Sequence, residues 1–276
     1  MDSCKYPLAA NSDVREPDLA ALAEATGLAG AQMHVRALDG EGPAWSADDG
    51  RWRYPASMIK VPLAVAVASA VAGGALRWND RVHIDPANVT ENDAPSPLGP
   101  GATGTVDELV ALMLQRSDNV ATNQLYDVVG RERATAALRD LGFRRTAFRR
   151  KLSGASLIDD PAASGRNSFL AGDAARLFAA IARDRVPGAA KLRDVLATSW
   201  WDVKLSRGLE PGDRFAHKTG DTSEVSHDGG ILTLAGGSRW VVVVYTELPG
   251  SEENDQRFGA FMRALRPHLR PEATPS

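Results

Sequence analysis

The chain has 276 residues, of which 43% are hydrophobic and 24% are charged, and its formal net charge is −3. This is ordinary globular composition with enough apolar material for a sizeable core, which excludes a mainly disordered chain. The small negative charge also argues against a protein that binds nucleic acid or an anionic membrane through a basic surface.

The N-terminal sequence has no apolar run that fits a signal peptide, so the chain as it stands is expected to be cytoplasmic. A secreted or periplasmic protein whose signal had been removed would look the same. The longest apolar stretch, Val61–Leu76, is too short and too broken by glycine to span a bilayer. Cys4 is the single cysteine, which excludes an intrachain disulfide, and the histidines lack ligand spacing. We therefore expect no metal and no cofactor.

The predicted elements begin with a helix over Pro17–Thr26, with Pro17 in its first turn, and a strand over Ala31–Leu38. A helix that is apolar on all sides follows from Ser57 to about Val71, which is typical of a buried helix. Thr105 and Glu108 form a capping-box sequence that opens a helix over 106–115. Further helices are predicted over Val120–Val129, Glu132–Leu141, Asp173–Arg183 and Ala190–Ser199.

After this helical block the pattern changes to strands. Gly230–Leu234 and Trp240–Thr246 are rich in β-forming residues and are joined by an Ala-Gly-Gly-Ser hairpin signal. A helix over Glu252–Leu269 closes the chain. A sheet that uses strands from both ends would enclose the helical block as an insertion. The order therefore predicts an α/β (α+β) fold with two lobes and a groove between them, where ligand sites commonly lie.

The first chemical motif is Ser57-Met-Ile-Lys60. On a helix, residues three apart share a face, so the hydroxyl and the amine can meet. A serine becomes nucleophilic when a base takes its proton, and a lysine whose pKa is lowered by burial or by another cation can be that base. Such short motifs also arise by chance, but Lys60 is a cation in an otherwise apolar helix and needs a partner.

Two more motifs follow. Ser117-Asp118-Asn119 offers a hydroxyl that can relay a proton and an amide that can bind a substrate amide, although these residues also favour turns and helix caps. Lys218-Thr219-Gly220, with strand-like sequence after it, can hold a carboxylate and let a substrate approach the backbone at the glycine. Its alternative reading is an ordinary polar strand start.

Together the three motifs resemble the signature of the serine penicillin-recognising enzymes. The run from Ser117 to Leu125 resembles the SDNxAxNxL run of class A β-lactamases, His227–Ile231 their next strand, and 166–168 the end of their omega loop. The resemblance covers roughly 18–269. It implies one β-lactamase-like catalytic domain over 15–270, with an antiparallel sheet flanked by terminal helices and an inserted all-helical lobe. The α/β lobe would span about 15–50 and 205–270, the helical lobe about 55–200, and the tails 1–14 and 271–276 would be flexible.

The resemblance also implies roles for the motif residues. Ser57 would form an acyl-enzyme, Lys60 would be its base, and Ser117 would pass the proton to the leaving nitrogen. Lys218 would hold Lys60 partly neutral and, with Thr219, bind a substrate carboxylate, while Asn119 would bind a side-chain amide. The N–H groups of Ser57 and Asp221 would form the oxyanion hole. The implied catalytic residues are Ser57, Lys60, Ser117 and Lys218, and the implied substrate-binding residues are Asn119, Thr219, Gly220 and Asp221.

The chain departs from the family at the omega-loop glutamate that activates the deacylating water. Leu152 takes that position if Arg150 matches the family arginine, and Lys151 takes it if Arg149 does. Removal of a general base typically costs ~10²–10⁴-fold in rate, so deacylation is expected to be slow or atypical. The alternative bases in the sequence are Asp221, Glu224, His217 and the pair Asp159 and Asp160.

Three functions remain open at this point: a serine hydrolase acting on a β-lactam or a related amide or ester, an intracellular acyltransferase of secondary metabolism, and a penicillin-binding relative without turnover. The expected partner is a small molecule with a carboxylate, bound by a monomer. For Trp200 and Trp201, packing in the core or between the lobes is favoured over lining the groove.

Overall fold

The computed structural model describes residues 16–40, 42–154 and 156–269. Within them, one antiparallel sheet of five strands has the order β2-β1-β7-β6-β5. Its strands are β1 (Gln32–Ala37), β2 (Ala44–Ala47), β5 (Arg214–Asp221), β6 (Ser226–Thr233) and β7 (Arg239–Thr246). β1 pairs with β7, so the two ends of the chain meet in the centre of the sheet, as the order of predicted elements required.

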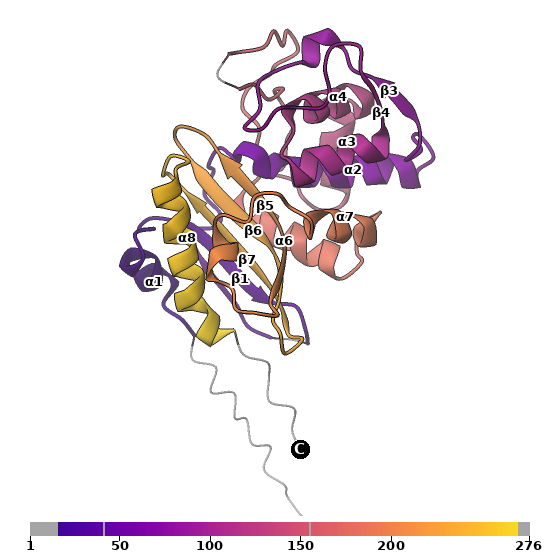
Figure 1. Ribbon diagram of the computed structural model, residues 1–276. Coiled ribbons are helices and arrows are strands. Elements are labelled where there is room, and N and C mark those ends of the chain that lie inside the picture. Colours follow the sequence, from indigo (N-terminus) through magenta and orange to yellow (C-terminus); the bar gives the residue numbers. More distant parts are fainter. Residues whose placement is uncertain (1–15, 41, 155, 270–276) are drawn as a thin grey trace, which may run out of the picture.

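One face of the sheet packs against the terminal helices. α1 (Leu19–Ala25) and α8 (Glu252–Leu265) contact each other, and both contribute to an apolar core with the side chains that this sheet face presents. Figure 1 shows α8 lying along the sheet, with α1 at its edge. This arrangement confirms the predicted antiparallel sheet flanked by terminal helices.

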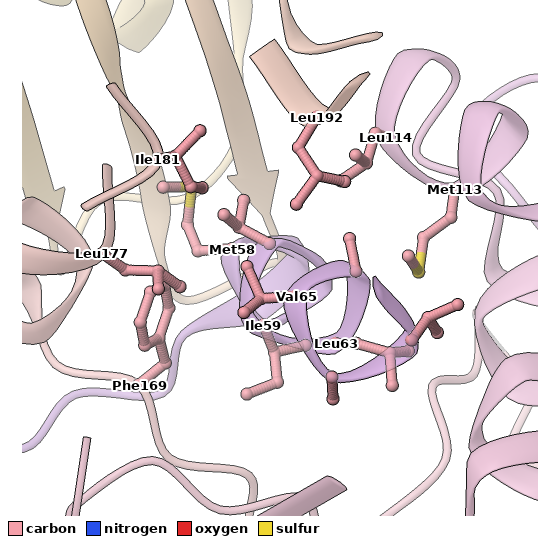
Figure 2. Close-up of a cluster of buried hydrophobic side chains, with 14 of the residues drawn as sticks. Met58, Ile59, Leu63, Val65, Met113, Leu114, Phe169, Leu177, Ile181 and Leu192 are labelled. Carbon is pink, nitrogen blue, oxygen red and sulfur yellow. The ribbon is translucent and has the colours of Figure 1, made fainter. Parts of the chain in front are cut away.

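The other face belongs to a second core that is shared with the inserted helices, of which α6 and α7 contact the sheet. The inserted helices are α2 (Lys60–Ala72), α3 (Val106–Gln115), α4 (Asn119–Val129), α5 (Arg131–Asp140), α6 (Ala171–Ala182) and α7 (Ala189–Leu196). α2 is the centre of this second core, because it is buried from Lys60 to Ala68 and therefore needs neighbours on every side. Figure 2 shows Leu63 and Val65 of α2 surrounded by side chains from α3, α6 and α7.

The inserted segment differs in two respects from the predicted helical lobe. The short strands β3 (Arg81–His83) and β4 (Thr103–Thr105) pair with each other, so the insertion is not all-helical. α6 packs against β1, β6 and β7, so this helix covers the sheet although we expected it in the helical lobe. The division into two lobes stays a prediction, and the predicted tails lie outside the described residues.

The capping signals in the sequence predicted the first residue of some helices more accurately than that of others. The capping box of Thr105 and Glu108 is formed, and α3 has the predicted bounds. α1 begins at Leu19 with Asp18 as its cap, so Pro17 lies before the helix and not in its first turn. No helix in the described residues is long and apolar enough to cross a membrane.

Candidate active site

Ser57 and Lys60 lie at the entry to the buried helix α2. Ser57 is in a short 3₁₀ turn, η1 (Ala56–Ile59), and Lys60 is the first residue of α2. Ala56 has a φ of +45°, a left-handed conformation that an alanine adopts only where its surroundings impose it. The turn places Lys60 Nζ 2.9 Å from Ser57 Oγ, so the predicted pairing of hydroxyl and amine is present.

The amine of Lys60 is enclosed by oxygen atoms. Its Nζ lies 2.6 Å from the Ser117 carbonyl oxygen, 3.0 Å from Ser117 Oγ and 2.8 Å from Asn119 Oδ1. Burial, and then the charge of Lys218, lower the pKa of Lys60 well below its ordinary value. A neutral amine has two N–H donors, and the two carbonyl-type oxygens can only accept. The lone pair of a neutral Lys60 is then left for a hydroxyl proton of Ser57 or Ser117.

Ser117 is placed by the junction between α3 and α4. It has a φ of +60°, and the next residue, Asp118, caps α4 by accepting from the backbone N–H of Ala121 at 2.9 Å. The predicted capping role of this motif is therefore present, and its chemical role stays a prediction. Ser117 Oγ lies 3.0 Å from Lys60 Nζ and 3.0 Å from Lys218 Nζ, so its hydroxyl bridges the two amines.

Lys218 reaches this centre from β5, the edge strand of the sheet. The Lys-Thr-Gly motif lies in the last half of that strand, whereas the sequence suggested a strand after it. Burial, and then the Lys204 cation, lower the pKa of Lys218 to about 7. Its Nζ also donates to the Thr219 carbonyl oxygen at 2.8 Å. The charge of Lys218 is thus close enough to affect the pKa of Lys60, and its role in the site stays a prediction.

Lys204 is a buried cation that the sequence analysis did not identify. Its side chain is 1% exposed, forms an ion pair with Asp221 and lies 3.5 Å from Asp255 Oδ1 on α8. Lys204 precedes the short turn η3 (Leu205–Gly208). Asp228 Oδ2 accepts from the Leu205 backbone N–H at 3.0 Å and so fixes η3 beside the sheet. A single lysine in a loop gives no sequence signal for this position.

β5 is an edge strand and approaches the turn that holds Ser57. The backbone N–H of Thr222 donates to the Val225 oxygen at 2.9 Å, and Asp221 pairs with Ser226 in register. Hydrogen-bonded and non-hydrogen-bonded pairs alternate along an antiparallel ladder. The N–H of Asp221 therefore points away from β6, toward the open edge, where an oxyanion-hole donor must lie.

Gly220 lets this strand approach Ser57. A Cβ at this position would lie 3.0 Å from the Ser57 backbone nitrogen, 3.1 Å from that of Met58 and 3.2 Å from Ala56 Cβ. The sequence suggested that the glycine admits a substrate. The structure shows that this direction is filled by the turn that carries Ser57.

Asn119 already uses both ends of its amide. Its Oδ1 accepts from Lys60, and its Nδ2 donates to the Glu91 carbonyl oxygen at 3.1 Å. Because an amide nitrogen has two N–H groups, a second donor remains. Binding of a substrate amide by Asn119 stays a prediction.

A cleft of about 610 Å³ joins these parts. Five residues of the predicted site line it: Ser57, Ser117, Thr219, Gly220 and Asp221. The other three do not line it but are hydrogen-bonded around it: Lys60 to Ser57, Asn119 to Lys60, and Lys218 to Ser117. Trp201 also lines the cleft, and Trp200 is 61% exposed, so the expected packing of this pair is wrong. Asp93 is a further lining residue that the motifs did not indicate.

The loop over 149–168 holds no free carboxylate at the positions compared with the family glutamate. Leu152 is buried in the core, and its backbone N–H and carbonyl bond to Asn123. The Lys151 amine lies 2.8 Å from Asp127 Oδ2. Asp160 accepts two hydrogen bonds from Arg131, at 2.7 and 2.9 Å, so its carboxylate clamps the loop.

His217, another of the alternative bases in the sequence, is already bound to two carboxylates. It lies in β5 and is fully buried, with Nδ1 2.8 Å from Asp228 Oδ1 and Nε2 3.0 Å from Asp202 Oδ1. Burial alone would lower its pKa, but these two carboxylates raise it to about 9. An imidazolium with both N–H groups in use cannot accept a proton from water. In the described residues, no group of three or more His, Cys, Asp or Glu side chains is arranged to hold a metal ion.

Several solved structures are similar to this chain in fold. A β-lactamase from Sphaerobacter thermophilus is 27% identical, with coverage of 91% of this chain and 96% of the other and a TM-score of 0.78. An ancestral class A β-lactamase is 24% identical, with coverage of 90% and 97% and a TM-score of 0.77. A leucine-to-glutamate variant of PBP-A, solved as an acyl-enzyme complex with penicillin G, is 23% identical, with coverage of 90% and 92% and a TM-score of 0.78. Among curated proteins, no sequence matched.

The fold is thus that of the serine β-lactamases and penicillin-binding proteins, which confirms the predicted fold class. A model of the β-lactamase enzyme family matches residues 15–265, and the chain belongs to this family. The resemblance drawn from the three motifs is confirmed.

Proposed function

We propose that the protein is a serine hydrolase that forms an acyl-enzyme on Ser57 with an activated amide or ester, β-lactams included. The observation that carries this proposal is the placement of Lys60 Nζ 2.9 Å from Ser57 Oγ, with its remaining contacts to the oxygens of Ser117 and Asn119. A neutral Lys60 takes the Ser57 proton as Oγ attacks the carbonyl carbon. The proton then passes through Ser117 Oγ to the leaving group.

The same geometry supplies the other parts of an acyl transfer. The backbone N–H groups of Ser57 and Asp221 stabilise the oxyanion, since the Asp221 N–H points to the open edge of β5. Lys218 supports the path by lowering the pKa of Lys60 and by its contact with Ser117 Oγ.

We also propose that the acyl-enzyme is long-lived in water. Leu152 is buried, and Asp160 is bound by Arg131. A missing general base costs ~10²–10⁴-fold, so hydrolysis of the ester on Ser57 is slower than its formation. A small amine present at high concentration would compete with water for the acyl group, which is the transferase reading of the same site.

Intact mass spectra over time test the proposal. The protein is incubated with a phenylacetyl aryl ester and with a chromogenic cephalosporin, with and without an added amine. We expect a mass increase equal to the acyl group, located on the Ser57 peptide and lost slowly. Faster loss with amine supports transfer. The control is Ser57→Ala, which forms no adduct, and an adduct of equal yield in that variant would refute the proposal.

A further inference from the structure

Asp221 places a negative charge inside the cleft, beside the position where the substrate binds. Thr219 and Asp221 both line the cleft, and residues two apart on a strand project from the same face. Their side chains start about 7 Å apart along the strand. A substrate carboxylate held by the Thr219 hydroxyl would therefore face the Asp221 carboxylate at short range.

The Asp221 carboxylate is fixed in this place from two sides. On one side it forms an ion pair with Lys204, whose side chain is 1% exposed, while the Asp221 side chain is 35% exposed. On the other side lies Gly250, where a Cβ would come 2.9 Å from Asp221 Oδ1. Lys204 is the cation that could attract a substrate carboxylate on this face of β5. It is already paired with the carboxylate of Asp221, and the carboxylate of Asp255 lies 3.5 Å away.

The remaining cleft lining does not restore a positive charge. Its other charged members are Asp93, Arg207, Glu252 and Asp255. Three of these four are carboxylates, and the amine of Lys218 is buried beside the cleft, in contact with Ser117 and Thr219. A ligand in the cleft meets more negative than positive side chains.

We propose that Asp221 is a specificity-determining residue that disfavours acyl donors with a carboxylate next to the scissile bond, so that these react more slowly than donors that are neutral or carry an ammonium group there. This inference rests on the proposed acylation of Ser57. It reverses the expectation that the Lys-Thr-Gly motif alone suggests, because the motif analysis did not include the ion pair with Lys204.

Three phenylacetyl esters test the proposal, because they share one acyl group and differ in the charge of the leaving phenol. The phenols are meta-hydroxybenzoate, meta-hydroxybenzamide and meta-(aminomethyl)phenol. Because the aromatic ring is rigid, the charged group in the meta position cannot fold back and contact the ester carbonyl. The rate constant for formation of the Ser57 adduct is measured for the wild type and Asp221→Asn. Glu253→Gln is the control: it also removes one carboxylate, but Glu253 pairs with Arg257 and is not a lining residue.

We expect the wild type to react slowest with the carboxylate ester. Asp221→Asn should raise that rate about tenfold relative to the neutral ester, because a like charge at this range is removed from a partly buried site. The ammonium ester should lose rate in the same variant, and Glu253→Gln should change none of the ratios. Comparison with the neutral ester cancels the general effects of the substitution.

The opposite results overturn the proposal. They are a wild type that reacts fastest with the carboxylate ester, or an Asp221→Asn variant with unchanged ratios. If no ester acylates wild-type Ser57, the proposed function fails and the inference fails with it, whereas acylation by the neutral ester without the expected order refutes only the inference. If Asp221→Asn does not fold, the wild type is measured at increasing salt concentration instead. Salt screens repulsion between charges, so the acylation rate constant of the carboxylate ester must rise relative to that of the neutral ester, and a fall overturns the proposal.

Discussion

Lys204, Lys218 and Lys60 form a series of amines in which each influences the next. The Lys204 cation contributes to the pKa of Lys218 of about 7, and the Lys218 charge contributes to the lowered pKa of Lys60. Burial is the larger cause at both Lys218 and Lys60, since a charged amine without water is costly. The base strength of Lys60 therefore depends on residues that never touch Ser57.

Substitution of Lys218 by methionine tests this dependence. The Lys218→Met variant removes a cation, so the pKa of Lys60 rises and less of it is neutral at pH 7. We expect acylation of Ser57 to slow by roughly 10–100-fold at pH 7, because one to two pKa units correspond to that range. The deficit should shrink as the pH is raised toward 9. Rate constants over this pH range are the measurement.

Lys191→Met is the matched control, because Lys191 pairs with Asp107 outside the cleft and its loss should leave the rate unchanged. A deficit in Lys218→Met that stays constant with pH would contradict the electrostatic role and leave only the contact with Ser117.

The spacing of Ser57, Lys60, Ser117 and Lys218 could be read from the sequence because each motif is local and its chemistry is recognisable. Lys204 and Asp221 could not be paired in the same way. They lie seventeen positions apart, an η3 turn and a strand bring them together, and neither belongs to a periodic pattern. The sequence therefore indicated the four motif residues and Asp221 singly, whereas the ion pair between Asp221 and Lys204 appears only in the structure.

At the scale of elements, β5 carries most of the difference between expectation and structure. The strand contains His217, Lys218 and Gly220, residue types that weaken a strand signal. It forms because β6 pairs with it along its whole length and buries these residues. The start of α3 at Val106, by contrast, was predicted correctly, because its capping box is a local hydrogen-bond pattern that needs no tertiary support.

Gly220→Ala tests how closely β5 must approach η1, the turn that carries Ser57. The added methyl meets the backbone of Ser57 and Met58, which cannot move aside like a flexible side chain. We expect a loss of about 1–3 kcal/mol in the free energy of unfolding and a slower acylation of Ser57. Denaturant titration and the acylation rate measure the two effects.

Gly236→Ala serves as the comparison, since nothing lies within 4 Å of a Cβ at that position and a surface change of this kind stays within about 0.5 kcal/mol. If Gly220→Ala behaves like Gly236→Ala in both measurements, the close approach has no importance for the site.

At the scale of the whole molecule, the chain order places the site where the insertion meets the sheet. Ser57 comes from the entry to the insertion, Ser117 from its interior and Lys218 from the returning strand. The sequence predicted this arrangement because strands at both ends had to pair. It did not predict that α6 covers the sheet, since an amphipathic helix has the same pattern whichever apolar surface it meets.

Two buried histidines make the stability of the whole molecule depend on pH in opposite directions. Asp228 and Asp202 outweigh burial and raise the pKa of His217 to about 9, above its ordinary value of 6.5. Its stabilising effect is complete below pH 6.5 and is lost as the pH rises through 9. Burial lowers the pKa of His227 to about 4, so its effect is complete above pH 6.5 and is lost as the pH falls toward 4.

We therefore expect the melting temperature to be highest near pH 6.5 and to fall on both sides, with each histidine worth at most about 3 kcal/mol. In Asp202→Asn the alkaline fall should begin at a lower pH, because one of the two carboxylates that raise the pKa of His217 is removed. Thermal melts from pH 4 to 10 measure both. An alkaline limb that does not move in Asp202→Asn would contradict this assignment.

The central claim is that Lys60 is a neutral amine beside Ser57 at the pH where the protein works. The chain has six lysines, so an NMR titration of protein labelled at its lysine side chains resolves each amine, with single substitutions assigning Lys60 and Lys218. We expect Lys218 to titrate near pH 7 and Lys60 to lose its proton far below the ordinary lysine value of 10.5. Two amines that both remain protonated above pH 10 would contradict it.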